Sequence, residues 1–171
     1  MSHPVLDRAT LRTKGCGYED FELGRVFEHH WGRTFTQAEN ALFTTLTIHF
    51  NPTYTNVEFA KAMGHPDTPL NPLLVFNTIF GLSVEDLSET STAFLGVDEL
   101  KYHAPVYPGD TLFARSTVTA TRASAKNPEV GIATWHTRGF NQRDELVCEF
   151  LRSNRFKRRT DTANKPKEKQ S

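Results

Sequence analysis

The stretch of sequence that decides the fold runs from residue 71 to residue 84 and is NPLLVFNTIFGLSV. Asn71 is a favourable N-cap residue and Pro72 suits the first helical position, so the pattern predicts a helix that begins here. Apolar side chains point in nearly every direction around this helix, and the first charged residues after it are Glu85-Asp86. A helix that is apolar all round is buried on all sides, so other parts of the chain must wrap it.

The C-terminal half supplies the elements that wrap this helix. Four strands are predicted there, over residues 93–103, 111–122, 129–140 and from 146 onward. Two turn signals lie between them, Tyr107-Pro108-Gly109-Asp110 and the hairpin signal Asn141-Gln142-Arg143-Asp144. Long strands joined by tight turns form an antiparallel, curved sheet. One long helix buried inside such a sheet is the hot-dog arrangement, so the predicted fold class is α+β.

The N-terminal half is predicted to contribute a strand over residues 24–34 and two short helices. Thr36 and Glu39 match a capping box, which predicts the start of a helix of about ten residues. Asn51-Pro52 ends this helical region, because the residue before a proline is pushed out of helical conformations. A second helix is predicted from Asn56, with Gly64 as its C-terminal cap.

Length and composition indicate one domain with two loose ends. The chain has 171 residues, which suits a single domain. We expect a loose N-terminal segment over residues 1–17, a hot-dog domain over residues 18–159 and a basic, disordered tail over residues 160–171.

The charge balance and the cysteine content exclude several classes of protein. Lysine and arginine number 20, as do aspartate and glutamate, so bulk charge does not point to a nucleic-acid binder. We expect no membrane partner, because no run of about 18 apolar residues exists, and no secretory signal, because the first 30 residues lack an apolar core. No set of ligands has the spacing of a metal site, so we predict no metal. The two cysteines, Cys16 and Cys148, lie far apart in the sequence, which excludes a disulfide scaffold and predicts a cytoplasmic location.

Several motifs resemble the start of a MaoC-type dehydratase domain, a relative of the R-specific enoyl-CoA hydratases. The resemblance covers roughly residues 18–158, and the motifs follow one another in the order and spacing of that family. They include Tyr18-x-Asp20-Phe21-x-x-Gly24, Gly32-Arg33-Thr34-x-Thr36-x-Ala38-Glu39-Asn40, Phe50-Asn51-Pro52 and Pro105-Val106-x-Pro108-Gly109-Asp110-Thr111-Leu112. The segment from Phe140 to Cys148 looks most like the mesaconyl-CoA hydratase branch.

The resemblance implies a fold, a reaction and a mode of assembly. The fold is a hot-dog domain that dimerises by joining two sheets. The reaction is the addition of water across the double bond of an acyl-CoA thioester, in a site near the dimer interface. Coenzyme A enters only as part of the substrate, and no other cofactor is implied. We therefore expect a homodimer or a dimer of dimers, or a heteromer with another hot-dog chain.

The sequence departs from the family pattern at the expected site. The hydratases place an acidic residue before Asn-Pro and a histidine after it, whereas this chain has His49 and Tyr54 at those two positions. The family also uses a glycine amide at the start of the central helix to bind the thioester oxygen. Here that position is Pro72, which has no N–H. The amide of Leu73 and the side chain of Asn71 are the remaining candidate donors.

Three hypotheses remain open for this site. In the first, the chain is a hydro-lyase on a short, branched or dicarboxylic enoyl-CoA, with His49 as base, Tyr54 as its partner and Asn51 shaping the loop. In the second, it is a non-catalytic acyl-CoA-binding subunit that completes a partner chain. In the third, the site hydrolyses thioesters, for which Asp67 and Glu85 are the nearest acids.

The other histidines are weaker candidates. His29 and His30 are adjacent on a predicted strand and point to opposite faces, so we expect one packed and one surface side chain. His65 lies in the loop before the central helix, close to where a ligand would enter. His103 lies at a strand end, and neither His65 nor His103 is assigned a role.

Overall fold

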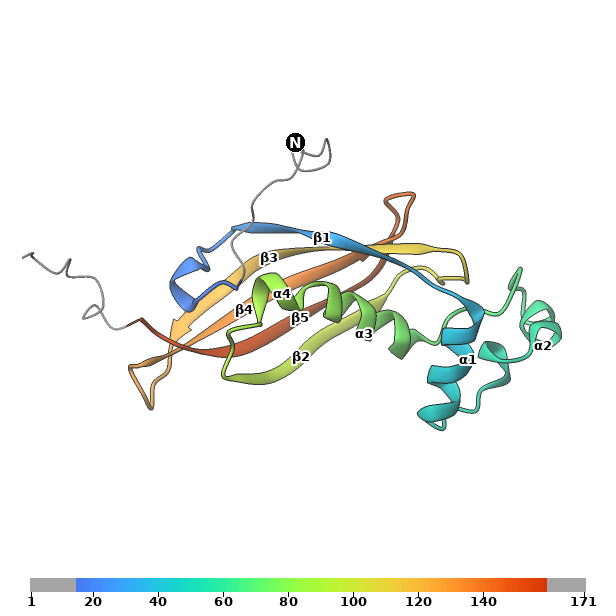
Figure 1. Ribbon diagram of the computed structural model, residues 1–171, viewed down its shortest axis with the longest axis horizontal. Helices are drawn as coiled ribbons and strands as arrows, with labels where there is room; N and C mark the ends of the chain where they lie inside the picture. The colour runs from blue at the N-terminus through green and yellow to red at the C-terminus, as the bar shows by residue number, and fades with distance from the viewer. Residues whose placement is uncertain (1–14, 160–171) are drawn as a thin grey trace, which may run out of the picture.

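A computed structural model of the chain describes residues 15–159 as one antiparallel sheet with helices on one face and at one end (Figure 1). The helical elements in chain order are η2 (Tyr18–Asp20), α1 (Gln37–Leu46), η3 (Pro52–Tyr54), α2 (Val57–Ala62), α3 (Pro72–Leu82) and α4 (Val84–Leu87). The strands are β1 (Val26–Thr34), β2 (Ala93–Tyr102), β3 (Thr111–Ala123), β4 (Val130–Phe140) and β5 (Leu146–Lys157).

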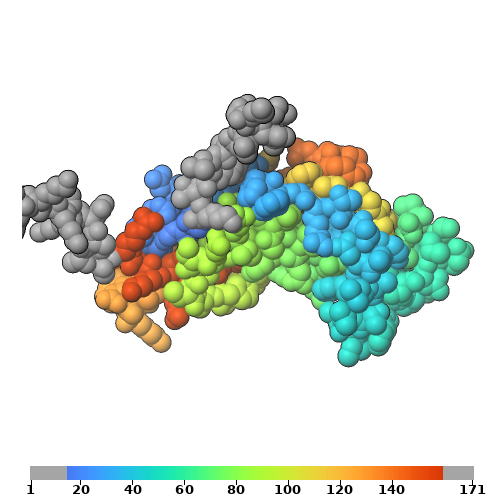
Figure 2. Space-filling view, viewed as in Figure 1, coloured from blue at the N-terminus to red at the C-terminus, as the bar shows by residue number. Residues whose placement is uncertain are grey.

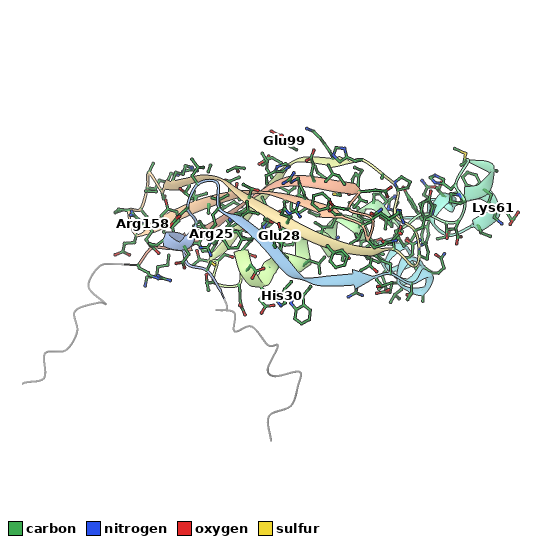
Figure 3. All side chains as sticks on the ribbon, turned by 90° about the horizontal axis from the view of Figure 1, so that it is seen from above. Arg25, Glu28, His30, Lys61, Glu99 and Arg158 are labelled. Atoms are coloured by element: carbon green, nitrogen blue, oxygen red, sulfur yellow. The ribbon has the colours of Figure 1, made fainter. Side chains whose placement is uncertain are left out.

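The five strands form a sheet in the order β1-β3-β4-β5-β2, and each neighbouring pair is antiparallel. The helices α3 and α4 lie along one face of this curved sheet, and α1, η3 and α2 gather at one end (Figure 1). The molecule is elongated, with Lys61 on α2 and Arg158 after β5 at its two ends (Figure 3). This α+β arrangement confirms the predicted hot-dog fold class.

The predicted starts of the helices are confirmed, because the capping residues act as expected. The Thr36 hydroxyl accepts a hydrogen bond from the Glu39 amide, and the Glu39 carboxylate accepts one from the Thr36 amide. The Asn56 side chain caps α2, and the Asn71 side chain caps α3. The helical region predicted up to Val84 is divided at Ser83, which is the C-cap of α3 and the N-cap of α4.

One predicted turn has a different role from the one expected. Tyr107–Asp110 does form a turn, closed by a bond from the Asp110 amide to the Tyr107 carbonyl. It leads from β2 on one edge of the sheet to β3 on the other side, so it does not join two paired strands. The segment after Phe140 does form the predicted hairpin between β4 and β5.

The core consists of two apolar clusters on the helical face of the sheet, one that includes residues of α3 and one that includes a residue of α4. The first cluster includes Val75 and Ile79 of α3 with Phe150 of β5. The second includes Leu87 of α4 with Trp135 of β4. Its remaining members are Phe21, Phe27, Val118, Ala133 and Phe156. The two clusters position the start of α3 at one end of the sheet and α4 at the other.

The central helix is buried on one face only, which corrects the expectation that this chain alone would wrap it. Val75 and Ile79 are buried against the sheet, whereas Leu73 is 45% exposed. Strand β2, at the edge of the sheet, is also largely exposed. The segment from α1 to α2 projects as a lobe at one end (Figure 2), where Leu46, Ile48 and Phe50 are exposed.

Two of the predicted segments fall mostly outside the described residues. The N-terminal segment over residues 1–17 is described only from Gly15, and the predicted tail over residues 160–171 is not described. None of the helices between residues 15 and 159 is both long enough and apolar enough to cross a membrane.

Candidate functional site

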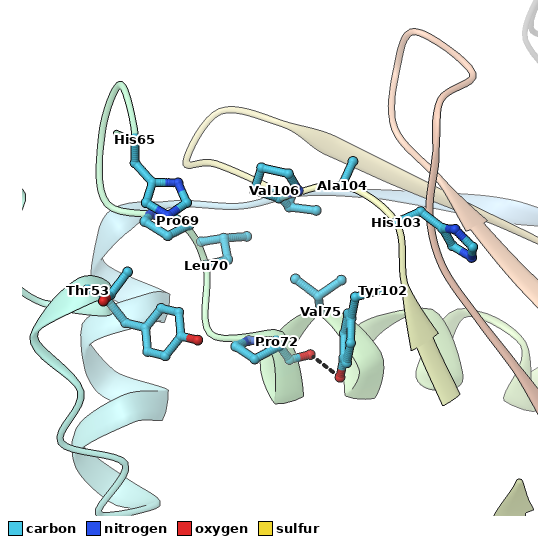
Figure 4. A pocket seen from close by; sticks show the side chains of 12 residues that line it. Thr53, His65, Pro69, Leu70, Pro72, Val75, Tyr102, His103, Ala104 and Val106 are labelled. Carbon is cyan, nitrogen blue, oxygen red and sulfur yellow. Dashed lines mark hydrogen bonds between the residues drawn. The ribbon is translucent and has the colours of Figure 1, made fainter. Parts of the chain in front are cut away.

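The start of α3 borders a pocket of about 320 Å³. Its walls come from η3, from the loop before α3, from α3 itself and from the segment that follows β2 (Figure 4). The lining is mainly apolar, with Leu70, Val75 and Val106 at its base, and its polar groups include those of Tyr54, His65 and His103. An apolar pocket with a few polar groups beside a helix start has the character of a small-molecule site.

Tyr102, at the end of β2, links the pocket wall to the helix start. Its hydroxyl donates a hydrogen bond to the Pro72 carbonyl over 2.8 Å (Figure 4). Burial, together with the nearby Cys148 and Tyr54, raises the pKa of Tyr102 to about 12, so the phenol stays protonated at neutral pH. Tyr102 was not among the residues singled out from the sequence, because its position at the end of a strand gives no signal of a nearby helix start.

Asn71 organises the N-terminus of α3 from a fully buried position. Its side-chain oxygen accepts a hydrogen bond from the Leu73 amide at 3.0 Å. Its side-chain nitrogen lies 3.3 Å from the Thr44 hydroxyl and 2.8 Å from His49 Nδ1. Its own amide donates to the Asn40 side chain. Asn71 therefore ties the central helix to α1 and to the loop that carries His49.

The contacts of Asn71 determine which nitrogen of His49 carries the proton. Since the Asn71 oxygen faces the Leu73 N–H, the Asn71 NH₂ group faces His49 Nδ1 and must donate to it. Nδ1 of His49 is then an acceptor without a proton, and the neutral ring carries its proton on Nε2. A ring in this form donates a hydrogen bond from Nε2. For Nε2 to accept a proton, the proton of the neutral ring would have to sit on Nδ1 instead. The hydrogen bond from Asn71 to Nδ1 would first have to break.

The structure brings His49 and Tyr54 together, as the sequence predicts. Their ring centroids are 5.4 Å apart and the ring planes meet at 62°. Tyr54 lines the pocket, whereas His49 lies outside the set of residues that line it. Asn51 has a local role that fits the prediction for it, because its side chain accepts a bond from the Thr53 amide and caps η3.

The predicted oxyanion donor is engaged within the helix. The Leu73 amide donates to the Asn71 side chain, and the amides of Leu74 and Val75 donate to the Asn71 carbonyl. Pro72, the first helical residue, has no amide hydrogen to offer. A role for Leu73 or Asn71 in binding a thioester oxygen stays a prediction, and it requires the bond between them to open.

The two acids considered for thioester hydrolysis are both occupied. Asp67 accepts hydrogen bonds from the amide and the hydroxyl of Thr68. Glu85 accepts a bond from the indole of Trp31 at 2.8 Å. Among the described residues that line the pocket, none carries a carboxylate. The described lining of the pocket thus supplies apolar surface, hydroxyl groups and imidazoles.

The two histidines that were left without a role both line the pocket. His65 lies 3.0 Å from the Tyr107 hydroxyl, and His103 lies 3.0 Å from the Glu149 carboxylate. The second oxygen of Glu149 is held by His136, so one carboxylate joins two histidines on the sheet. His65 and His103 could therefore contact a ligand while their partners fix them in place.

A second polar cluster crosses the interior away from this pocket. Asp86 of α4 lies 2.6 Å from His29 Nδ1, and His29 Nε2 lies 2.9 Å from the Ser116 hydroxyl. Ser116 in turn lies 2.8 Å from the Thr137 hydroxyl. Burial lowers the pKa of His29 despite the opposing effect of Asp86. His30 is exposed, so the expectation of one packed and one surface histidine is confirmed.

Comparison with known proteins now identifies the family. A family model described as mesaconyl-CoA hydratase matches residues 2–170. The chain belongs to the mesaconyl-CoA hydratase family. It is 36% identical over 152 residues to the beta-methylmalyl-CoA dehydratase of Chloroflexus aurantiacus, a match that spans 89% of this chain and 43% of that protein.

Two solved structures place the fold in the same group. A MaoC domain protein dehydratase from Chloroflexus aurantiacus superposes with a TM-score of 0.83 at 35% identity, over 92% of this chain and 45% of that one. Rv0216 of Mycobacterium tuberculosis, described as a double hot-dog fold, gives a TM-score of 0.75 at 26% identity, over 89% of this chain and 46% of that one. The resemblance to MaoC-type dehydratases is thereby confirmed.

The chain spans less than half the length of the first curated relatives that it matches. Their activities are therefore a starting point for a proposal about this chain. Between residues 15 and 159, no group of three or more His, Cys, Asp or Glu side chains is arranged to hold a metal ion.

Proposed function

We propose that this chain is a hydro-lyase unit that adds or removes water at the double bond of a short enoyl-CoA thioester. The observation that carries the proposal is the match to the mesaconyl-CoA hydratase family along residues 2–170. The apolar pocket at the start of α3 supports it, since a short acyl group needs an apolar wall beside a few polar groups. A dicarboxylic or branched acyl group, such as mesaconyl, is the substrate class we infer.

Within this proposal, His49 and Tyr54 are the polar groups that meet the substrate or the water. The bond from Asn71 to Nδ1 favours His49 as a donor through Nε2–H. This differs from the role of base that the sequence suggested, and it lets His49 polarise a carbonyl oxygen or orient a water. Asn51 holds the loop that carries both residues, and the amide of Leu73 is the donor at the helix start.

Hydration of a small panel of enoyl-CoA thioesters tests the proposal. Crotonyl-CoA and mesaconyl-CoA are mixed with the purified chain, and the loss of enoyl-thioester absorbance is followed. We expect turnover that falls at least about tenfold in His49→Ala and in Tyr54→Phe, as for the loss of one catalytic donor. Leu23→Ala, a change at an exposed position 74% open to solvent, serves as the matched control. Full activity of both site variants would remove these residues from the site.

A second candidate function is that of a non-catalytic acyl-CoA-binding unit. Two observations favour it: the described residues that line the pocket carry no carboxylate, and His49 is held as a donor, so neither group is placed as the base. The two imidazoles in the lining, His65 and His103, are held by Tyr107 and Glu149. In this case the chain completes a second hot-dog unit that carries the aspartate and histidine of the family.

The two candidates differ in what the chain does alone. A hydro-lyase of this chain only is active as a homodimer, and its activity does not rise with a second hot-dog chain. A helper unit binds acyl-CoA but hydrates it only when mixed with a chain that carries the missing pair. Failure to bind any acyl-CoA, alone or mixed, would contradict both.

We also propose a cytoplasmic location, which fits a CoA thioester as substrate.

A further inference from the structure

Arg152 is the most unusual charged residue in the interior. It lies on β5, on the face of the sheet that carries α3, and it is fully buried. Among the described residues, none accepts a hydrogen bond from its Nε, Nη1 or Nη2. Arginine presents five N–H donors in a fixed fork, and proteins rarely bury this fork without a carboxylate or phosphate to receive it.

The groups around Arg152 hold the guanidinium without satisfying it. Its central carbon lies 4.3 Å from the Phe80 ring centroid and 5.3 Å from that of Trp135. These rings attract a cation through their faces, but they accept none of its hydrogen bonds in the plane of the fork. Burial lowers the pKa of Arg152 to about 10, so the group is still charged at neutral pH.

Asp86, the acid of the interior polar cluster that contains His29, already has a partner other than Arg152. Asp86 lies 2.6 Å from His29, which continues to Ser116 and Thr137. Burial lowers the pKa of His29 in this cluster and the charge of Arg152 helps to lower it, yet among the described residues none of these groups accepts a hydrogen bond from the Arg152 fork. An arrangement of this kind suits an anion that comes from outside the chain.

We propose that Arg152 binds the free carboxylate of a dicarboxylic acyl-CoA, at the end of the acyl group opposite the thioester. The proposal deepens the function proposed above and rests on it. A carboxylate is planar and matches the guanidinium fork with two parallel hydrogen bonds. The phosphates of coenzyme A are the other anions of such a ligand, but they lie at its far end, away from the acyl group.

The position of Arg152 along the central helix fits this assignment. Val75 of α3 lines the pocket, and Phe80 of the same helix covers Arg152. Five residues of helix separate them, which is about 7.5 Å. A short acyl group that enters at the pocket and runs along α3 toward Phe80 approaches the guanidinium of Arg152, which packs on that ring.

Aromatic side chains form the wall between the pocket and Arg152. The Phe76 ring packs on Phe150 with centroids 5.0 Å apart and on Phe80 with centroids 5.9 Å apart. Phe76 and Phe80 are only partly buried, and both pack against the core cluster that contains Val75 and Phe150. An apolar wall that ends in one cation selects an acyl group that is apolar in the middle and anionic at its tip.

Binding of two saturated thioesters tests the proposal without relying on turnover. Succinyl-CoA carries the distal carboxylate and butyryl-CoA carries a methyl group in its place, and neither has a double bond to hydrate. Their affinities are measured by calorimetry for the wild type, Arg152→Met and Arg152→Lys. Arg155→Met, an exposed arginine on the same strand, is the control.

The wild type should bind succinyl-CoA at least about tenfold more tightly than butyryl-CoA, as expected for one charge-assisted carboxylate contact. Arg152→Met should bring this ratio close to one, Arg152→Lys should keep part of it, and Arg155→Met should keep all of it. Arg152→Met should stay folded and melt at the same or a higher temperature, because it removes a buried charge that has no partner.

Two results would overturn the proposal: equal affinity of the wild type for both thioesters, or a preference for succinyl-CoA that survives in Arg152→Met. Hydration of crotonyl-CoA and of mesaconyl-CoA by the wild type is recorded in parallel. Turnover of either substrate supports the proposed function whatever the two affinities show, and turnover of neither contradicts it. The failure of the arginine assignment is thereby distinguished from the failure of the hydro-lyase assignment.

Discussion

At the scale of single residues, Asn71 has the largest influence on the candidate site. It is a helix cap, a donor to His49 and an acceptor from Leu73 at the same time. The cap could be predicted, because Asn before Pro at the start of an apolar run is a typical helix start. The bond to His49 could not, because it joins positions 22 residues apart and depends on how α1 packs against α3.

Asn71→Asp should change the protonation of His49. A carboxylate only accepts hydrogen bonds, so it cannot donate to His49 Nδ1, and the ring should move its proton to Nδ1 to face the new oxygen. The tautomer is measured from the ¹⁵N chemical shifts of the imidazole. We expect a bare Nδ1 in the wild type and a protonated Nδ1 in the variant. A wild-type ring already protonated at Nδ1 would contradict the assignment.

Asn71→Ala should destabilise the protein by about 2–4 kcal/mol. The change removes an N-cap, which costs about 1 kcal/mol, and leaves buried partners unsatisfied. Urea unfolding measures the loss. Asn56→Ala, which removes the cap of the exposed helix α2, is the comparison and should cost only about 0.5–1 kcal/mol. Equal losses in both variants would show that the buried contacts of Asn71 contribute little.

His29 should make stability depend on pH. Its pKa in the folded protein is lowered by burial, so between that value and its usual value of about 6.5 the unfolded chain binds more protons than the folded one. Stability therefore should fall as pH decreases below about 6.5. His29→Gln should flatten this part of the melting-temperature profile, whereas His30→Gln, at the exposed neighbouring position, should leave it steep.

At the scale of elements, the sequence predicted the features that are held by contacts between residues close together in the chain. The capping box of α1 and the hairpin after Phe140 are confirmed within a residue or two. The break at Ser83 was not predicted, because the apolar pattern continues through Val84. Ser83 is buried and its hydroxyl donates to the Phe80 carbonyl, so a local bond from a side chain to the backbone accompanies the end of α3 where the apolar pattern continues.

The contact between α3 and β4 depends on a glycine. A Cβ atom at Gly139 would lie inside the van der Waals radius of the Ile79 side chain, which is fully buried. Gly139→Ala should therefore cost about 1–3 kcal/mol through overpacking. The double variant with Ile79→Val makes room at this point and should recover part of the loss. Denaturant unfolding of the wild type, Gly139→Ala and the double variant measures these changes in stability. An unchanged stability in Gly139→Ala would contradict the close packing of Gly139 against Ile79.

At the scale of the whole molecule, residues 15–159 leave several large apolar side chains exposed. Leu73 on α3 and Leu95 on β2 are 45% and 50% exposed, and the lobe from α1 to α2 exposes several more apolar side chains. The sequence predicted a helix buried on all sides, and the structure buries only one face. A pattern of apolar residues predicts burial, but it does not tell a contact within this chain from a contact with a second unit.

The exposed edge strand should be where a second hot-dog unit joins. The wild type is expected to sediment as a dimer. Leu95→Lys places a charge on the exposed part of β2 and should shift the protein toward monomer without unfolding it. Leu23→Lys, at an exposed position away from β2, should leave the dimer intact. A wild type that is monomeric at high concentration would direct attention to a heteromeric partner.

The most direct test of the account follows the fate of labelled water. Mesaconyl-CoA is incubated with the purified chain in H₂¹⁸O, and the products are examined by mass spectrometry. The account predicts an intact thioester that has gained one molecule of labelled water in its acyl group. Free coenzyme A with a labelled free acid would show thioester hydrolysis and contradict the account. Unchanged substrate, both alone and with a second hot-dog chain that carries the aspartate and histidine, would contradict it as well.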